Sequence, residues 1–362
     1  MRTKALAISF ALLAGAGASG CGTTTDTGSP STSSSPSGST GSTSGSGGTV
    51  ASGGDLGCAA AEGAVVGFSE PLPDPNFKII EDILTEELAK VGATLKPVNA
   101  NLDPGKQIGD IATLQQQGIQ ALIVNPVDPN AVQGALADVK AAGIPVIAED
   151  TEVGGPYYTS VQSDSGVAGA EGAALMKSEV SDGDVAQMNG PPFAEILERS
   201  RIGFEAGADE EGLNIVDTQV NAQITPDAAK ALAEQWKQRY GADLKGIWTF
   251  NDVSATGVAS TFDDGYKPVL ISINGQPDII PLIKAGTVTA TFDLQTDVAG
   301  RTLAYAAINA ICGVELPEQI WVGAKLIDAS NVDSWVPPAE RAKDGGTITL
   351  EERDGKTYVV GS

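Results

Sequence analysis

The sequence contains no histidine and few basic residues, and both shortages narrow what the protein can do. Without histidine the chain lacks the usual general base, any Ser-His triad and the commonest metal ligand, so an enzyme would have to use carboxylates, lysine or cysteine. Lys and Arg number 22 against 46 Asp and Glu, which gives a net charge of −24. Since phosphate binding needs clustered Lys and Arg, we expect no nucleic-acid partner.

Long apolar runs are also missing after the N-terminus, where no stretch reaches the roughly 18 residues that a membrane span requires. The N-terminus itself has a basic "MRTK", an apolar "ALAISFALLAGAGA" and then "ASGC", which ends at Cys21. This order resembles a lipoprotein signal peptide over residues 1–20, with lipid attached to Cys21. Ordinary secretory cleavage nearby is the alternative. Two acyl chains would hold the protein stably on the outer face of the cell membrane.

Residues 21–56 are nearly all Ser, Thr, Gly and Pro. Such a segment cannot bury a hydrophobic core. We therefore predict a disordered tether, whose end-to-end distance as a flexible coil is roughly 30–35 Å.

From Gly57 onward, short apolar stretches that end on polar residues alternate with segments of helical periodicity. "GAVVGFSE" precedes "NFKIIEDILTEELAKVG", and "GIWTFND" precedes "VSATGVASTFDDG". Strands that alternate with helices indicate βαβ units and a parallel sheet covered by helices on both faces. The sequence therefore predicts an α/β fold, and its length allows two domains.

Polar residues stand at the carboxyl ends of many predicted strands, the edge where ligands bind in such sheets. Each could instead cap the helix that follows, and for Asn251 and Asn274 both interpretations stay open, whereas capping is favoured for Asn125. The strand-end residues are Ser69, Asn125, Asp150, Asn189, Asn251 and Asn274.

Several motifs in order resemble type I solute-binding proteins of bacterial ABC transporters, in particular the ribose-binding group. They include "ALIVNPVDPNAVQGALADVKAAGIPVIAED", "FNDVSATG", "INGQPDIIPLIKAGTVTATF" and "DVAGRTLAYAAINAICG". The resemblance implies two Rossmann-like lobes of parallel sheet, joined by three hinge crossings, with the ligand in the cleft between them. We expect a first lobe of residues 57–162 plus 294–326, a second lobe of 163–293 plus 327–335, and a C-terminal extension of 336–362 that contains a hairpin around Asp354-Gly355. The hinges would lie near Val161–Asp164, Phe292–Gln295 and Lys325–Asp328.

The resemblance carries ligand-binding roles onto residues of the first lobe. The loop "PLPDPNFK" stands where the family places Asn and stacking aromatics, and the family's acid after the fourth strand matches Asp150. Thr151 stands where an Arg is frequent. The predicted ligand-binding residues here are Asp74, Asn76, Phe77, Asp150 and Thr151.

The remaining roles fall on the second lobe and the hinge. Either Arg199 or Arg201 would supply the family's arginine, and we favour Arg199. Asn221 or Gln223 falls where a cleft aromatic is common, and Asn274 replaces an Asp. For Trp248 and Phe250 the core is favoured, and an apolar face toward the ligand is the alternative. The predicted ligand-binding residues here are Arg199, Gln223, Asn251, Asn274, Asp293 and Gln295.

These residues suit a neutral, hydroxyl-rich ligand, because carboxylates accept and amides both donate and accept hydrogen bonds. The resemblance implies a monomer without cofactor or metal that captures a sugar or polyol and delivers it to an ABC permease. An amine-bearing ligand, a ligand-sensing partner and a carboxylate enzyme that uses Asp150 and Asp293 remain the alternatives.

Cys58 and Cys312 remain once Cys21 is assigned to lipid, and export permits a disulfide. In the family both elements belong to the first lobe, so the resemblance implies a Cys58–Cys312 pair. Two separate buried thiols are the alternative.

Overall fold

The computed structural model describes residues 57–151, 157–192 and 194–360. The predicted signal peptide, Cys21 and the tether lie outside these residues. Across the described part of the chain, no helix combines the length and apolarity needed to cross a membrane.

The first sheet has eight strands in the order β13-β14-β11-β5-β4-β3-β1-β2. Its strands are parallel except for the antiparallel pair β13 and β14. The strands are β1 (Val65–Glu70), β2 (Thr94–Asn99), β3 (Ala121–Val124), β4 (Val146–Glu149), β5 (Thr159–Ser163), β11 (Gln319–Val322), β13 (Thr349–Arg353) and β14 (Lys356–Val360).

The second sheet has six strands in the order β12-β10-β9-β8-β6-β7, and only β12 runs antiparallel to its neighbour. Two mainly parallel sheets confirm the predicted α/β fold class. The strands are β6 (Asp184–Asn189), β7 (Asn214–Val220), β8 (Leu244–Thr249), β9 (Val269–Asn274), β10 (Ala290–Asp293) and β12 (Lys325–Asp328).

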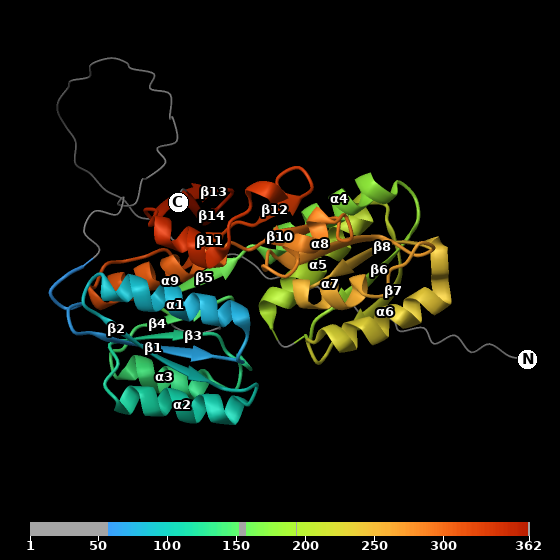
Figure 1. Cartoon of the computed structure of the whole chain (residues 1–362). Coiled ribbons are helices and arrows are strands. Elements are labelled where there is room, and N and C mark those ends of the chain that lie inside the picture. Colours follow the sequence, from blue (N-terminus) through green and yellow to red (C-terminus); the bar gives the residue numbers. More distant parts are fainter. Residues whose placement is uncertain (1–56, 152–156, 193, 361–362) are drawn as a thin grey trace, which may run out of the picture. The chain divides into compact units, whose positions relative to one another are not determined.

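Helices cover both faces of each sheet, as buried parallel strands require. Figure 1 shows α1 and α9 on one face of the first sheet and α2 and α3 on the other. The second sheet lies between the α4–α5 pair and the helices α6, α7 and α8. The helices of the first group are α1 (Pro75–Ala89), α2 (Pro104–Gln116), α3 (Gln133–Ala141) and α9 (Thr296–Ile311), and those of the second are α4 (Ser165–Val180), α5 (Glu195–Glu211), α6 (Pro226–Tyr240), α7 (Asp252–Ala259) and α8 (Ile280–Lys284).

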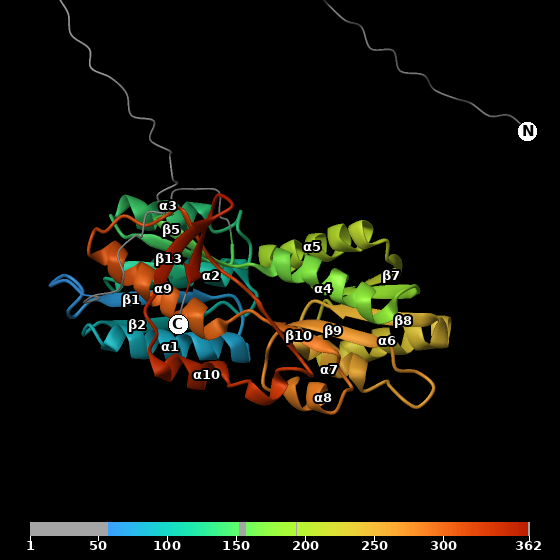
Figure 2. The same cartoon turned by 90° about the horizontal axis from the view of Figure 1, so that it is seen from above.

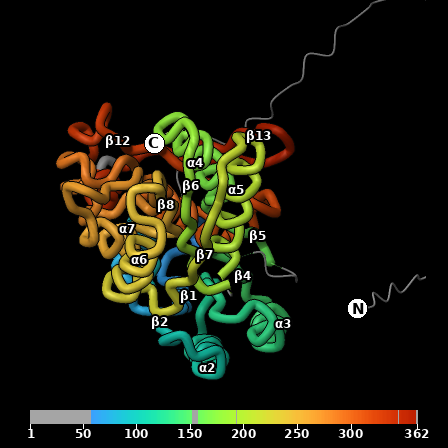
Figure 3. The backbone as a smooth tube through the Cα atoms, turned by 90° about the vertical axis from the view of Figure 1, so that its right-hand side faces the viewer, coloured from blue at the N-terminus to red at the C-terminus, as the bar shows by residue number. Residues whose placement is uncertain are grey.

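Helices α4 and α5 lie side by side in Figure 3. Glycines at their contact allow the two backbones to approach more closely than residues with side chains would. A Cβ atom added at Gly203 would lie 2.0 Å from the carbonyl oxygen of Gly166, and one at Gly169 would lie 2.4 Å from that of Ser200. The glycines therefore let the two helices approach, and this fixes the N-terminal end of α5 near the end of β5.

The C-terminal extension adds two strands to the first sheet. After β12 the chain forms α10 (Pro338–Arg341) between the short helices η2 (Val332–Ser334) and η3 (Ala342–Asp344), and it returns to the first sheet as β13 and β14. Figure 2 shows this return, with α10 beside α1. The chain thus passes between the sheets a fourth time, because the extension is long enough to come back and bury Ile348 and Leu350 against Tyr305 and Ile320.

The predicted hairpin is present within that extension. Strands β13 and β14 pair antiparallel around Asp354 and Gly355, whose φ angles are 51° and 75°. Two consecutive residues with positive φ are what a tight two-residue hairpin needs, and Asp-Gly adopts them readily. The short β12 also places Lys325 and Leu326 in the second sheet, whereas we expected them in the first lobe.

Cys58 and Cys312 form a disulfide, the pairing that the resemblance implied. It joins the segment before β1 to the end of α9, which are 254 residues apart in sequence. Both cysteines pack against the hydrophobic core between the first sheet and its helices. The disulfide therefore links the start of the first lobe to α9, a part of the same lobe that follows most of the second lobe in sequence.

Candidate functional site

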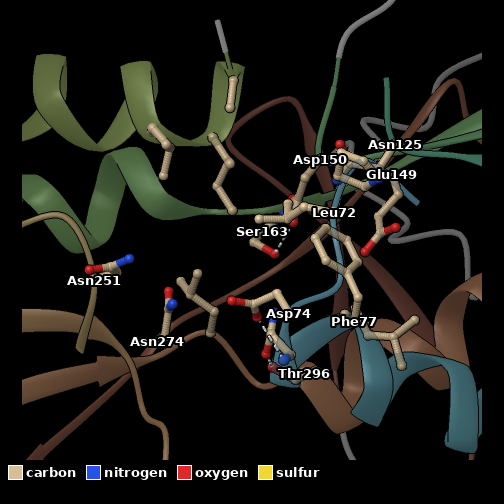
Figure 4. A pocket seen from close by; sticks show the side chains of 18 of the residues that line it. Leu72, Asp74, Phe77, Asn125, Glu149, Asp150, Ser163, Asn251, Asn274 and Thr296 are labelled. Atoms are coloured by element: carbon tan, nitrogen blue, oxygen red, sulfur yellow. Dashed lines mark hydrogen bonds between the residues drawn. The ribbon is translucent and has the colours of Figure 1, made fainter. Parts of the chain in front are cut away.

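A pocket lies where the carboxyl ends of strands from both sheets converge, and Figure 4 shows its wall residues. The space between its walls, counted together with its open mouth, is about 990 Å³. The first sheet contributes the segment after β1, the start of α1 and the end of β4. The second contributes the start of α5 and the segments after β8 and β9.

Six of the predicted ligand-binding residues line this pocket, and they come from both sheets. They are Asp74, Asn76, Phe77, Asp150, Asn251 and Asn274. The other predicted residues are not part of its wall in this structure. They are Thr151, Arg199, Gln223, Asp293 and Gln295.

The first-lobe wall is held by the start of α1. Asp74 caps this helix, because its Oδ1 accepts a hydrogen bond of 2.8 Å from the Asn76 backbone N–H. The Asn76 Oδ1 in turn accepts from the Thr296 hydroxyl at 2.8 Å. These bonds fix both side chains and leave the second Asp74 oxygen and the Asn76 amide nitrogen for a ligand. Burial raises the pKa of Asp74, although its bond from Asn76 acts in the opposite direction.

Asp150 follows β4 with a φ of 48°, a conformation that few residues other than Gly and Asn adopt. Its carboxylate accepts from the Ser163 backbone N–H at 2.5 Å and from the Ser163 hydroxyl at 3.0 Å. The Arg199 guanidinium lies 3.8 Å away. Burial raises the pKa of Asp150 and outweighs the opposing effects of Arg199 and Ser163. The carboxylate is therefore oriented before any ligand arrives.

The second-lobe wall presents two amides. Asn251 caps α7 through its Oδ1, which accepts from the Ser254 N–H at 2.8 Å. Capping fixes the amide so that its nitrogen points into the pocket in Figure 4, and capping and pocket lining therefore coexist at this residue. Asn274 ends β9 with a φ of 126°, and in the described part of the chain its side chain makes no hydrogen bond.

Asp293 and Gln295 are engaged at the hinge rather than in the pocket. Arg341 of the C-terminal extension donates to both Asp293 oxygens, at 2.5 and 3.2 Å. The Gln295 side chain donates to the Gly323 carbonyl at 2.6 Å. Since Asp293 is fully buried beneath Arg341, it does not face Asp150 across the pocket as a carboxylate enzyme would require.

The other three residues lie around the pocket rather than in its wall. Arg199 sits beside Asp150 with its guanidinium 5.6 Å from the centre of the Trp321 ring, whereas Arg201 pairs with the exposed helix residues Glu198 and Glu205. Gln223 is exposed, and Thr151 is buried.

Glu149 lines the pocket and was not predicted to do so. Only 3% of its surface is exposed, and its Oε2 is buried without a hydrogen-bond partner. Burial raises its pKa well above the usual range, and the negative charges of Asp150 and Glu70 add to this. The resemblance assigned the ligand-binding acid after the fourth strand to Asp150 alone, so Glu149 was not considered. The turn after β4 brings both acids to the pocket.

The aromatic residues divide between the pocket and the core. Phe77 and Phe250 line the pocket. Trp248 is fully buried and stacks on Phe204, with 4.8 Å between ring centres. Phe77 therefore supplies an apolar face of the first lobe and Phe250 one of the second.

Comparison with known proteins places the chain in a family. The periplasmic binding protein domain matches residues 70–315. The ribose import binding protein of Bacillus subtilis (strain 168) is 29% identical over 258 residues, which cover 70% of this chain and 84% of that protein. The xylitol-binding protein of Mycolicibacterium smegmatis (strain ATCC 700084 / mc(2)155) is 24% identical over 261 residues, 70% of each chain.

A solved structure agrees with these relatives. An ABC transporter solute-binding protein from Mycobacterium smegmatis with bound glycerol is 26% identical, with a TM-score of 0.69 over 75% of this chain and 96% of that one. Proteins of this family bind solutes and are not enzymes. The chain belongs to the periplasmic binding protein domain family, as a solute-binding protein similar to the ribose-binding proteins of ABC transporters.

Proposed function

We propose that this exported protein captures a small hydroxyl-rich molecule, a sugar or polyol, and delivers it to an ABC importer. The observation that carries the proposal is the pocket wall, in which Asp74 and Asp150 of the first lobe face Asn251 and Asn274 of the second, and which Asn76 also lines. Carboxylates accept hydroxyl hydrogens, and amides both donate and accept. Ligands named for the relatives, ribose, xylitol and glycerol, all present this chemistry.

Binding acts by closing the two lobes on the ligand. A ligand that contacts both walls stabilises the closed form, since only that form satisfies both sets of hydrogen bonds. The hinges are the passages between the sheets near Val161–Asp164, Phe292–Gln295 and residues 323–324, just before the expected stretch Lys325–Asp328, together with the return of the chain from β12 to β13. Small-angle scattering should give a smaller radius of gyration with saturating ligand, and an unchanged radius would argue against closure.

Attachment to the membrane completes the proposed function. Lipid on Cys21 holds the protein on the outer face of the cell membrane, and residues 21–56 serve as the tether that lets it reach the permease. Mass spectrometry of the mature protein tests this, because a diacylated N-terminal Cys21 supports the anchor and a free N-terminus elsewhere excludes it.

A thermal-shift screen of the purified protein against sugars and polyols tests the binding function, because a ligand that binds only the native state raises the melting temperature. Asp150→Ala and Asn251→Ala should each weaken the binding of any ligand found by about tenfold to a hundredfold, the usual cost of a lost buried partner. Gln223→Ala, at an exposed position outside the wall, is the matched control. If all three variants bound the ligand with the same affinity, Asp150 and Asn251 would not belong to the binding site.

A further inference from the structure

The pocket wall is acidic on one side. Asp74, Glu149 and Asp150 all line it, and no lysine or arginine does so among the described residues. The nearest guanidinium, that of Arg199, lies 3.8 Å from Asp150 and outside the wall. A neutral ligand would bring no positive charge to this side of the pocket.

The three acids differ in how far the protein already satisfies them. Asp74 accepts from the Asn76 N–H, and Asp150 accepts twice from Ser163. Glu149 makes no hydrogen bond or ion pair within the described residues, although only 3% of its surface is exposed. Leaving a buried polar group without a partner is costly, and folded proteins rarely do so without a reason.

The surroundings of Glu149 point to a positively charged group from outside the protein. Figure 4 shows its side chain directed toward the ring of Phe77, so a group bound there would also meet an aromatic face. Within the described residues no set of three acidic or cysteine side chains is arranged to hold a metal ion. An organic cation therefore fits the position better than a metal ion does.

We infer that the ligand is a hydroxylated amine, an amino sugar or amino polyol, whose ammonium group binds Glu149 while its hydroxyls bind Asp74, Asp150 and the two amides. This inference rests on the proposed function, because it assigns the ligand class of the same pocket. The ammonium supplies both a counter-charge and a hydrogen-bond donor to the one acid that lacks them. A sugar hydroxyl supplies only the donor.

Proton exchange should accompany binding. Burial raises the pKa of Glu149, and the charges that act on it come from Asp150 at the same strand end and Glu70 at the end of β1, while Arg199 faces Asp150. A bound ammonium favours the ionised carboxylate, so amine binding releases the proton that Glu149 holds in the free protein. Affinity for the amine should therefore rise as the pH rises from 5 to 7.5. The pH at which it rises reflects the coupled titration of Glu149, Asp150 and Glu70 and not of Glu149 alone.

Calorimetry of the purified protein with matched ligand sets tests the inference. Each set shares one skeleton: glucosamine, N-acetylglucosamine and glucose; galactosamine, N-acetylgalactosamine and galactose; glucamine and sorbitol. We expect at least one amine to bind about tenfold or more tightly than its neutral counterparts. Titrations in two buffers of different ionisation enthalpy should also reveal proton release with the amine alone.

Two variants separate a specific role of Glu149 from a general effect of charge. Glu149→Gln keeps the shape of the side chain and should remove both the preference for the amine and the proton release. Glu70→Gln is the matched control, since Glu70 is a buried acid at a nearby strand end that does not line the pocket and already binds Asn99. In Glu70→Gln the ratio of amine affinity to neutral-ligand affinity should stay within about threefold of that of the unmodified protein.

The outcomes distinguish this inference from the proposed function. If neutral sugars or polyols bind as tightly as the amines and Glu149→Gln leaves the ratio unchanged, the inference is wrong and the binding function stands. If no member of any set binds, both fail. A Glu149→Gln protein that loses amine and neutral ligand equally also overturns the inference, because Glu149 would then act on the pocket as a whole.

Discussion

Two buried acids at the carboxyl ends of the two sheets have opposite surroundings. Asp252, at the start of α7 in the second lobe, accepts from the Ser272 hydroxyl at 2.5 Å, the Thr291 hydroxyl at 2.7 Å and the Gln276 N–H at 2.7 Å. Glu149, at the end of β4 in the first lobe, has no donor within the described residues. Both are at most 3% exposed.

The difference separates structural acids from acids that await a ligand. A buried carboxylate with three donors holds its surroundings together, and its removal should damage the fold. A buried carboxylate without donors weakens the fold, and its removal should damage binding instead. Asp293 and Asp297 at the hinge belong to the structural class, because Arg341 pairs with both.

The largest effect should come from breaking the hinge cluster. Arg341→Met leaves Asp293 and Asp297 buried without this partner and should lower the free energy of unfolding by about 3–5 kcal/mol. Urea denaturation followed by circular dichroism measures it. The control is Arg353→Met, which removes a solvent-exposed pair with Glu351 on the hairpin and should leave the free energy of unfolding almost unchanged. Equal losses in the two variants would remove Asp293 from the structural class.

The second largest effect is expected for Asp252→Ala. This variant should lower the free energy of unfolding by about 2–4 kcal/mol, because three hydrogen-bond donors lose their acceptor. The same denaturation experiment measures it. Asp252→Asn keeps an acceptor oxygen and should recover part of the loss. A change below about 0.5 kcal/mol in the Ala variant would mean that this network does not stabilise the second lobe.

The pH dependence of stability compares the two acids in one experiment. Burial raises the pKa of Asp252 to about 7, although its three hydrogen bonds act in the opposite direction, and it also raises that of Glu149. When the pKa of an acid is higher in the folded state, the folded protein holds the proton more tightly, so the free energy of unfolding falls as the pH rises from about 4 to 7.

Glu149→Gln should therefore flatten this fall and raise the stability of the ligand-free protein at pH 8 by about 1 kcal/mol or more, with little change near pH 4. Chemical denaturation at a series of pH values measures both. A destabilised variant at pH 8 would show that Glu149 has stabilising partners after all.

The smallest effect on stability is expected for Asn274→Ala. The side chain makes no hydrogen bond in the described part of the chain, so the free energy of unfolding should change by less than about 0.5 kcal/mol. Ligand affinity should fall about tenfold, because the amide faces the pocket. If Asn274→Ala lowered the stability but not the ligand affinity, Asn274 would be a structural residue and not a ligand-binding one.

The sequence predicted the fold far better than the details of the pocket. Apolar periodicity and the resemblance located the strands, and the strand-end rule located Asp150, Asn251 and Asn274 at the wall. Glu149 was missed, because the resemblance assigned the ligand-binding acid to Asp150 alone, and the turn after β4 decides whether the preceding side chain also reaches the pocket.

The hinge residues show a second limit of sequence reasoning. Asp293 and Gln295 were assigned to the ligand from their places beside the family's hinge position. Their partners in the structure are Arg341 and the carbonyl of Gly323, which lie 48 and 28 residues away in sequence. The Arg341 contact depends on the path of the C-terminal extension, and the Gly323 contact depends on how the chain passes from β11 to β12. No local sequence pattern reveals either of them.

A crystal structure with the tightest ligand from the screen tests the account most directly. We predict a ligand held between the lobes, with hydrogen bonds to Asp150 and Asn251 and an ammonium nitrogen within about 3 Å of the Glu149 carboxylate. A ligand bound outside this pocket, or one that occupies it while Glu149 still has no partner, would contradict the account.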